Sequence, residues 1–155
     1  MYQRILVPVD GSATALQGLQ QAIALARLSG GQLRLLHVTD ELSAALALGS
    51  YAPVATDIFA VLHEAGQELL NQARAQAIDQ GIAADVVLDE APGRRLADAV
   101  LEQVRSWPAD LIVLGTHGRR GVSHLLLGSD AEQVLRVAPV PVLLVRSADE
   151  PAPQA

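Results

Sequence analysis

The sequence GTHGRRGVSHLLLGS, residues Gly115–Ser129, follows four apolar residues at Leu111–Leu114 and precedes a segment of helical spacing at Asp130–Val137. This order predicts a buried strand, then a glycine-rich loop that ends at the N-terminus of a helix. Glycine has no Cβ, so such a loop lets the backbone come close to a ligand. A helix N-terminus offers N–H groups and a positive dipole end, which suit a phosphate. The stretch predicts a nucleotide phosphate site, with simple turn formation by the glycines as the alternative.

Apolar runs alternate with helical segments along the rest of the chain. Strands are expected at 4–9, 33–38, 84–88, 110–114 and 142–146, and helices at 13–28, 57–80, 94–106 and 130–137. The connection at 39–56 is interpreted as a surface excursion with a short helix at 42–48, or as a binding loop. The buried helix faces are expected to be Leu16, Leu19, Ile23 and Ala26, then Ile58, Leu62, Ala65, Leu69 and Ala73, then Leu96, Val100, Val104 and Trp107.

The expected strands are apolar on both faces, which is typical of a parallel sheet covered by helices on both sides. The fold class is therefore α/β, a single doubly wound, Rossmann-like domain at 1–146, with a disordered polar tail at 147–155. Ligands of such sheets bind beyond the carboxyl ends of the strands, where the strand order reverses. A reversal between the first and fourth strands would bring Asp10-Gly11-Ser12 beside Gly115.

Composition narrows the classes of partner. The formal net charge of −6 argues against duplex nucleic acid, and two tyrosines, one phenylalanine and one tryptophan supply few stacking platforms for single strands. Apolar runs are far shorter than the ~20 residues of a membrane span. We therefore expect no membrane insertion and, because the start does not resemble a signal peptide, a cytoplasmic protein. The chain contains no cysteine and no lysine, so phosphate binding must use backbone N–H groups, hydroxyls and arginine.

Three segments carry a family resemblance. Gly115, Gly118 and Gly128-Ser129 have the G-2x-G-9x-G-S spacing that resembles the signature of the ATP-binding subgroup of the universal stress protein family. The opening ILVPVDGS and the ending PVPVLLVR are similar to the first and last strands of that family. The resemblance implies a five-stranded parallel sheet in the order 3-2-1-4-5 and a homodimer paired through the last strand, Val140–Val145. It also implies a stress-response or regulatory role, usually without an established reaction.

The resemblance also implies site residues. Pro8, Val9 and Asp10 would line the adenine and ribose pocket, and Val38 would meet adenine through its backbone. Gly128 and Ser129 would hold the β- and γ-phosphates. The full expected set for the nucleotide is Pro8, Val9, Asp10, Ser12, Val38, Leu114, Gly115, Thr116, His117, Gly118, Arg119, Gly128, Ser129 and Asp130. No separate metal site is expected.

Asp130 departs from the family pattern, in which an apolar residue or threonine usually follows the serine. A carboxylate in a first helical turn favours the helix dipole. It would repel a triphosphate if it faced the ligand, and the alternatives are that it points to solvent or holds Mg²⁺.

Three functions follow from these residues. The first is a binding protein for ATP, with or without Mg²⁺, or for AMP or ADP. The second is a slow ATPase or nucleotidyl-transfer enzyme in which Asp10 and Asp130 hold Mg²⁺ and His117 orients water. The third is a dimeric interaction protein that does not bind ATP and acts on a protein partner that the sequence does not identify. Of the other histidines, His37 is expected to be structural and His63 exposed.

Overall fold

The computed structural model describes residues 1–40, 55–116 and 127–146. Its elements are β1 (Arg4–Pro8), α1 (Ala13–Ser29), β2 (Gln32–Val38), α3 (Ala55–Asp79), β3 (Ala84–Asp89), α4 (Leu96–Ser106), β4 (Leu111–Gly115), α5 (Ser129–Val137) and β5 (Val142–Val145). The helix expected at 42–48, the tail at 147–155, and His117, Gly118 and Arg119 lie outside the described residues. No helix in the described part is both long and apolar enough to cross a membrane.

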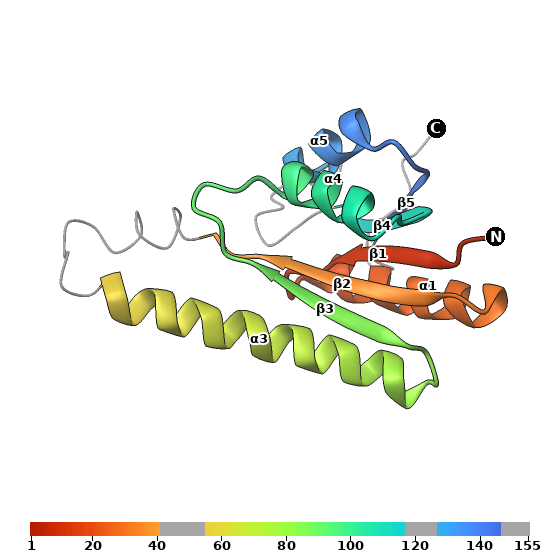
Figure 1. Cartoon of the computed structure of the whole chain (residues 1–155), viewed down its shortest axis with the longest axis horizontal. Coiled ribbons are helices and arrows are strands. Elements are labelled where there is room, and N and C mark those ends of the chain that lie inside the picture. Colours follow the sequence, from red (N-terminus) through yellow and green to blue (C-terminus); the bar gives the residue numbers. More distant parts are fainter. Residues whose placement is uncertain (41–54, 117–126, 147–155) are drawn as a thin grey trace.

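The strands of the described part form one parallel sheet in the order β3-β2-β1-β4-β5, as expected (Figure 1). In register, Ile5 of β1 lies between Leu33 of β2 and Leu111 of β4. The strand order therefore reverses between β1 and β4. The carboxyl ends of these two strands, far apart in sequence, meet at one edge of the sheet.

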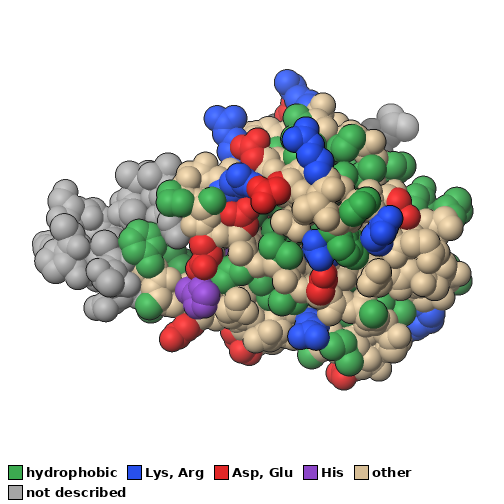
Figure 2. Space-filling view, viewed as in Figure 1, with side chains coloured by type: hydrophobic (Ala, Val, Ile, Leu, Met, Phe, Trp, Pro, Cys, Tyr) green, Lys and Arg blue, Asp and Glu red, His purple; other side chains and the backbone are tan. Residues whose placement is uncertain are grey.

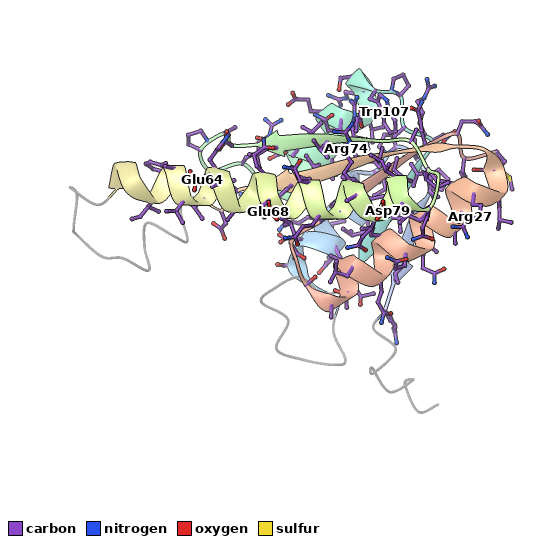
Figure 3. All side chains as sticks on the ribbon, turned by 90° about the horizontal axis from the view of Figure 1, so that it is seen from below. Arg27, Glu64, Glu68, Arg74, Asp79 and Trp107 are labelled. Atoms are coloured by element: carbon purple, nitrogen blue, oxygen red, sulfur yellow. The ribbon has the colours of Figure 1, made fainter. Side chains whose placement is uncertain are left out.

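Alternating strand residues divide the core into two layers. Ile5, Val7 and Leu35 pack with α1 and α3 on one face of the sheet. Leu6 and Leu36 pack with α4 and α5 on the other. Figure 3 shows α1 and α3 side by side, and hydrogen bonds link them: Gln20 Nε2 donates to Gln76 Oε1 at 2.9 Å, and Arg27 Nη2 donates to Gln80 Oε1 at 2.8 Å.

Local signals account for the bounds of α1. The Ser12 hydroxyl accepts a hydrogen bond from the Ala15 N–H at 3.2 Å, so Ser12 caps the helix as expected. Gly30 ends it in the left-handed region at φ 69°, where glycine avoids the steric cost of a Cβ.

Two predicted helix faces are partly wrong. Leu19, Ile23 and Ala26 of α1 are buried as expected, but Leu16 is 41 % exposed, because the helix turns Ala15 and Ala22 toward the sheet in its place. In α3 the buried residues include Gly66, Leu70, Ala73 and Ala77, whereas Ala65 is exposed and Leu62 and Leu69 are half-buried. The last three line a cavity at the sheet edge, so apolar spacing there marks a pocket wall and not the core. In α4, Val100 and Val104 are buried as expected.

Candidate functional site

A cavity of about 850 Å³ lies at the carboxyl edge of the sheet, where β1 and β4 are neighbours. Its described walls come from the ends of β1, β2 and β4, from the starts of α4 and α5, and from α3. Most of the residues predicted from the sequence line it: Pro8, Val9, Asp10, Ser12, Val38, Leu114, Gly115, Gly128, Ser129 and Asp130. The fold thus brings together the two loops that lie about a hundred residues apart in the chain.

The turn after β1 is held by its own polar side chains. Asp10 Oδ1 accepts a hydrogen bond from the Ser12 N–H at 2.9 Å. Ser12 in turn caps α1. The Asp10 carboxylate therefore fixes the turn from which α1 starts, and it also lines the cavity.

His37 joins the ends of β1 and β2. Its Nδ1 lies 2.8 Å from the carbonyl oxygen of Val9. A carbonyl oxygen only accepts, so Nδ1 is the nitrogen that carries the proton. This structural role was expected, but the ring also forms part of the cavity wall beside Val38. His63 is exposed, as expected, and its Nδ1 lies 2.8 Å from Glu90 Oε1.

Backbone hydrogen bonds of Thr116 connect the end of β4 to β5 and to Gly128. The Thr116 N–H donates to the Val145 carbonyl and its own carbonyl accepts from the Gly128 N–H, each at 2.9 Å. The residue is buried, and it is absent from the described cavity wall. These bonds place Gly128, and with it the start of α5, next to the end of β4.

The N-terminus of α5 lies at this wall, and no described side chain caps it. The N-cap residue is Gly128, so no side chain caps the helix, in contrast to Ser12 at α1. The first N–H groups of a helix have no acceptor within the helix, and they are good anion donors. Ser129 and Asp130 are exposed and line the cavity. An anion at this end would therefore meet backbone N–H groups, the Ser129 hydroxyl and the Asp130 carboxylate.

The described residues do not form a metal site on their own. No group of three or more histidine, cysteine, aspartate or glutamate side chains is close enough among residues 1–40, 55–116 and 127–146 to hold an ion. Asp10 and Asp130 both line the cavity, so Mg²⁺ would need phosphate oxygens from a ligand to complete its coordination.

Comparison with known proteins decides the family. The family model described as "Universal stress protein family" matches residues 1–146. The chain belongs to the universal stress protein family. Universal stress protein MJ0531 of Methanocaldococcus jannaschii is 33 % identical over 150 residues, an alignment that covers 94 % of this chain and 83 % of the relative.

Solved structures show the same fold as this universal stress protein. The structure of the protein MJ0577 has 26 % sequence identity and a TM-score of 0.80, and the match covers 94 % of this chain and 96 % of that one. A universal stress protein in complex with cAMP has 25 % identity and a TM-score of 0.64, and covers 95 % of this chain and 98 % of its own.

Part of the cavity wall consists of residues that were not predicted from the sequence. Leu62, Gly66 and Leu69 of α3 and Arg94 and Arg95 before α4 all line it. The two arginines follow β3, whose carboxyl end lies at the same edge as those of β1 and β4. The rule that placed Asp10 and Gly115 at this edge would have found them.

Arg94 is held by carboxylates. Its Nε lies 3.2 Å from Asp89 Oδ2, and its Nη2 contacts Glu102 Oε2. The hydrogen bond to Glu102 raises the pKa of the Arg94 guanidinium, with Asp89 acting in the same direction. Figure 2 shows acidic and basic side chains gathered around the β3–α4 loop and the start of α4.

Proposed function

We propose that this universal stress protein binds an adenine mononucleotide, with ATP as the preferred ligand, in the cavity between the ends of β1 and β4. One observation carries the proposal. The Asp10–Ser12 turn, the end of β2 and the uncapped N-terminus of α5 line a single cavity of about 850 Å³.

The phosphates would bind at the start of α5. The backbone N–H groups of the first turn and the Ser129 hydroxyl are the donors, and the helix dipole adds favourable charge. His117, Gly118 and Arg119 would complete this end of the site, as the family signature implies. Mg²⁺ would enter with the nucleotide, held by its phosphates and by Asp10 or Asp130.

The adenosine would bind toward β2 and α3. Leu62 and Leu69 supply apolar surface there. Val38 ends β2 and also lines the cavity, and the next residue, Thr39, donates its N–H to the Asp89 carbonyl at 3.0 Å. Asp10 would accept hydrogen bonds from the ribose hydroxyls. A similar universal stress protein in complex with cAMP supports an adenine nucleotide as ligand and makes a cyclic monophosphate the second candidate.

The proposal also includes an oligomeric state and a cellular role for the protein. β5 is an edge strand of the sheet in the described part, and Leu143 on it is 37 % exposed, which supports a homodimer paired through Val140–Val145. The protein would act in the cytoplasm as a nucleotide-dependent regulator of a protein partner. Catalysis is the alternative: ATP hydrolysis at this site would be seen as ADP release from labelled ATP.

Calorimetric titration tests the proposal. We expect saturable ATP binding to the wild type and about tenfold weaker binding to Ser129→Ala, because a hydrogen bond to a charged group contributes roughly 1.5–3 kcal/mol. The control is Ser106→Ala at the exposed end of α4, outside the described cavity wall. No heat of binding with ATP, AMP or cAMP would contradict the proposal, and equal affinity in both variants would remove Ser129 from the site.

A further inference from the structure

Two adjacent arginines stand out on the cavity wall. Of the described cationic side chains, those of Arg94 and Arg95 line the cavity, together with the carboxylates of Asp10, Asp40 and Asp130. A polyphosphate in this cavity would meet more negative than positive side chains among the described residues. Each positive side chain there consequently affects how much more tightly the site binds a nucleotide than an unphosphorylated nucleoside.

Arg94 has its charge neutralised within the protein. It pairs with Asp89 and Glu102, and its Nε is buried without a hydrogen bond of good geometry. Its guanidinium is thus positioned by β3 and α4, and removing it would leave two carboxylates without their partner. It is a poor candidate for ligand selection.

Arg95 is different. Its side chain is exposed, and it makes no hydrogen bond or ion pair with any other described residue. It is also the N-cap of α4, at φ −87° and ψ 146°, and its side chain does not cap the helix. Serine, threonine, aspartate and asparagine are strongly preferred there, since their oxygens satisfy an N–H of the first turn. Arginine at this position does not provide that stabilisation. Residues that are unfavourable for local stability are expected mainly at functional sites.

Helix α4, which begins after Arg95, lies on the same face of the sheet as α5, where the phosphates are proposed to bind. α4 and α5 pack together on the same face of the sheet (Figure 1). Each connects parallel strands, so both begin at the carboxyl edge, and both N-termini line the cavity. A long, flexible guanidinium at the start of α4 is therefore on the same wall as the donors at the start of α5.

We propose that Arg95 pairs with a phosphate group of the bound nucleotide and, together with the donors at the start of α5, makes the site prefer phosphorylated over unphosphorylated adenosine. This inference rests on the proposed nucleotide binding. Guanidinium and phosphate form short, charge-assisted and often bidentate hydrogen bonds. Such a bond acts on ATP and AMP and is absent with adenosine.

The test compares Arg95→Ser with Arg105→Ser. Both remove one positive charge from α4, but Arg105 is exposed in the last turn, about 15 Å along the helix. Dissociation constants for ATP, AMP and adenosine are measured by calorimetry at two salt concentrations, with the melting temperature as a check of folding. Serine supplies the missing cap, so Arg95→Ser is expected to melt at or above the wild-type temperature.

We expect Arg95→Ser to bind ATP about tenfold or more weakly and adenosine within twofold of the wild type, with a shallower salt dependence for ATP. Arg105→Ser should match the wild type for every ligand. ATP binding by Arg95→Ser within twofold of wild type, or an equal loss for ATP and adenosine, would overturn the inference and leave nucleotide binding standing. Failure of the wild type to bind any of the three ligands would instead overturn the proposed function and this inference with it.

Discussion

Gly115 at the end of β4 and Thr14 in the first turn of α1 approach so closely that a Cβ on residue 115 would lie 2.8 Å from the Thr14 carbonyl carbon and 2.9 Å from its hydroxyl oxygen. This contact sets α1 against the end of β4, beside the cavity. A side chain on residue 115 would point toward α1. Its glycine is therefore required by packing within the protein, whatever it contributes to a ligand.

A methyl group at this position should be costly. We expect Gly115→Ala to lower the free energy of unfolding by about 1–3 kcal/mol or more, because the obstructing atoms belong to backbone that cannot move alone. The control is Gly18→Ala, in the middle of α1, where a Cβ would meet its nearest neighbour at an ordinary 3.7 Å. Alanine is the better helix former, so that variant should gain about 0.5–1 kcal/mol. Urea denaturation measures both, and equal stabilities would show that the contact relaxes freely.

Removing the charge of Asp130 should raise the affinity for ATP but lower the stability of the protein. We expect Asp130→Asn to bind ATP about fivefold more tightly, since two unit charges a few ångströms apart in water interact by roughly 1 kcal/mol. The same change should lower stability by about 0.3–1 kcal/mol through the lost interaction with the helix dipole. Glu132→Gln is the matched control, because Glu132 pairs with Arg136 and is outside the described cavity wall. Weaker ATP binding by Asp130→Asn would indicate instead that the carboxylate holds Mg²⁺.

Arg34 should stabilise the protein without affecting the ligand. Its guanidinium donates to both carboxylate oxygens of Asp85, donates to Gln103 at 3.2 Å and lies 4.6 Å from the centroid of the Trp107 ring. Arg34→Lys loses the planar geometry, so we expect a loss of about 1–2 kcal/mol in the free energy of unfolding. Arg27→Lys, which replaces one exposed hydrogen bond to Gln80, should change stability by less than about 0.5 kcal/mol. A change in ATP affinity with Arg34→Lys would be unexpected, because Arg34 is not part of the described wall.

A charge on the edge strand should dissociate the proposed dimer. Leu143→Lys places an ammonium group on β5, where natural edge strands use lysine to prevent pairing. Sedimentation velocity should show a dimer for the wild type and a monomer for this variant. Leu28→Lys is the control, because Leu28 is 86 % exposed near the end of α1 and is not part of β5. A variant that remains dimeric would place the interface elsewhere.

The apolar runs predicted an α/β fold with a parallel sheet, and the resemblance to the family implied the strand order that the structure has. The rule for ligand sites in such sheets then placed Asp10 beside Gly115, on the condition that the order reverses between the first and fourth strands. The sequence also predicted the Ser12 cap, which depends on neighbours in the chain. It failed at Leu16 and Ala65, since helical spacing does not reveal how each helix is rotated against the sheet. It missed Arg95 because an arginine before a helix carries no motif of its own, and the sheet-edge rule that placed Asp10 was not applied to the loop after the third strand.

The most direct test of nucleotide binding at the start of α5 is an NMR titration of the ¹⁵N-labelled protein with ATP. Backbone amide signals report where the ligand sits, residue by residue, without any substitution. We predict large, saturable shifts for the amides of Ser129, Asp130 and Ala131 and for the turn at Asp10–Ser12, with little change at Arg27 and Leu28 at the far end of α1. Saturable binding that leaves the 129–131 amides unmoved would contradict the account.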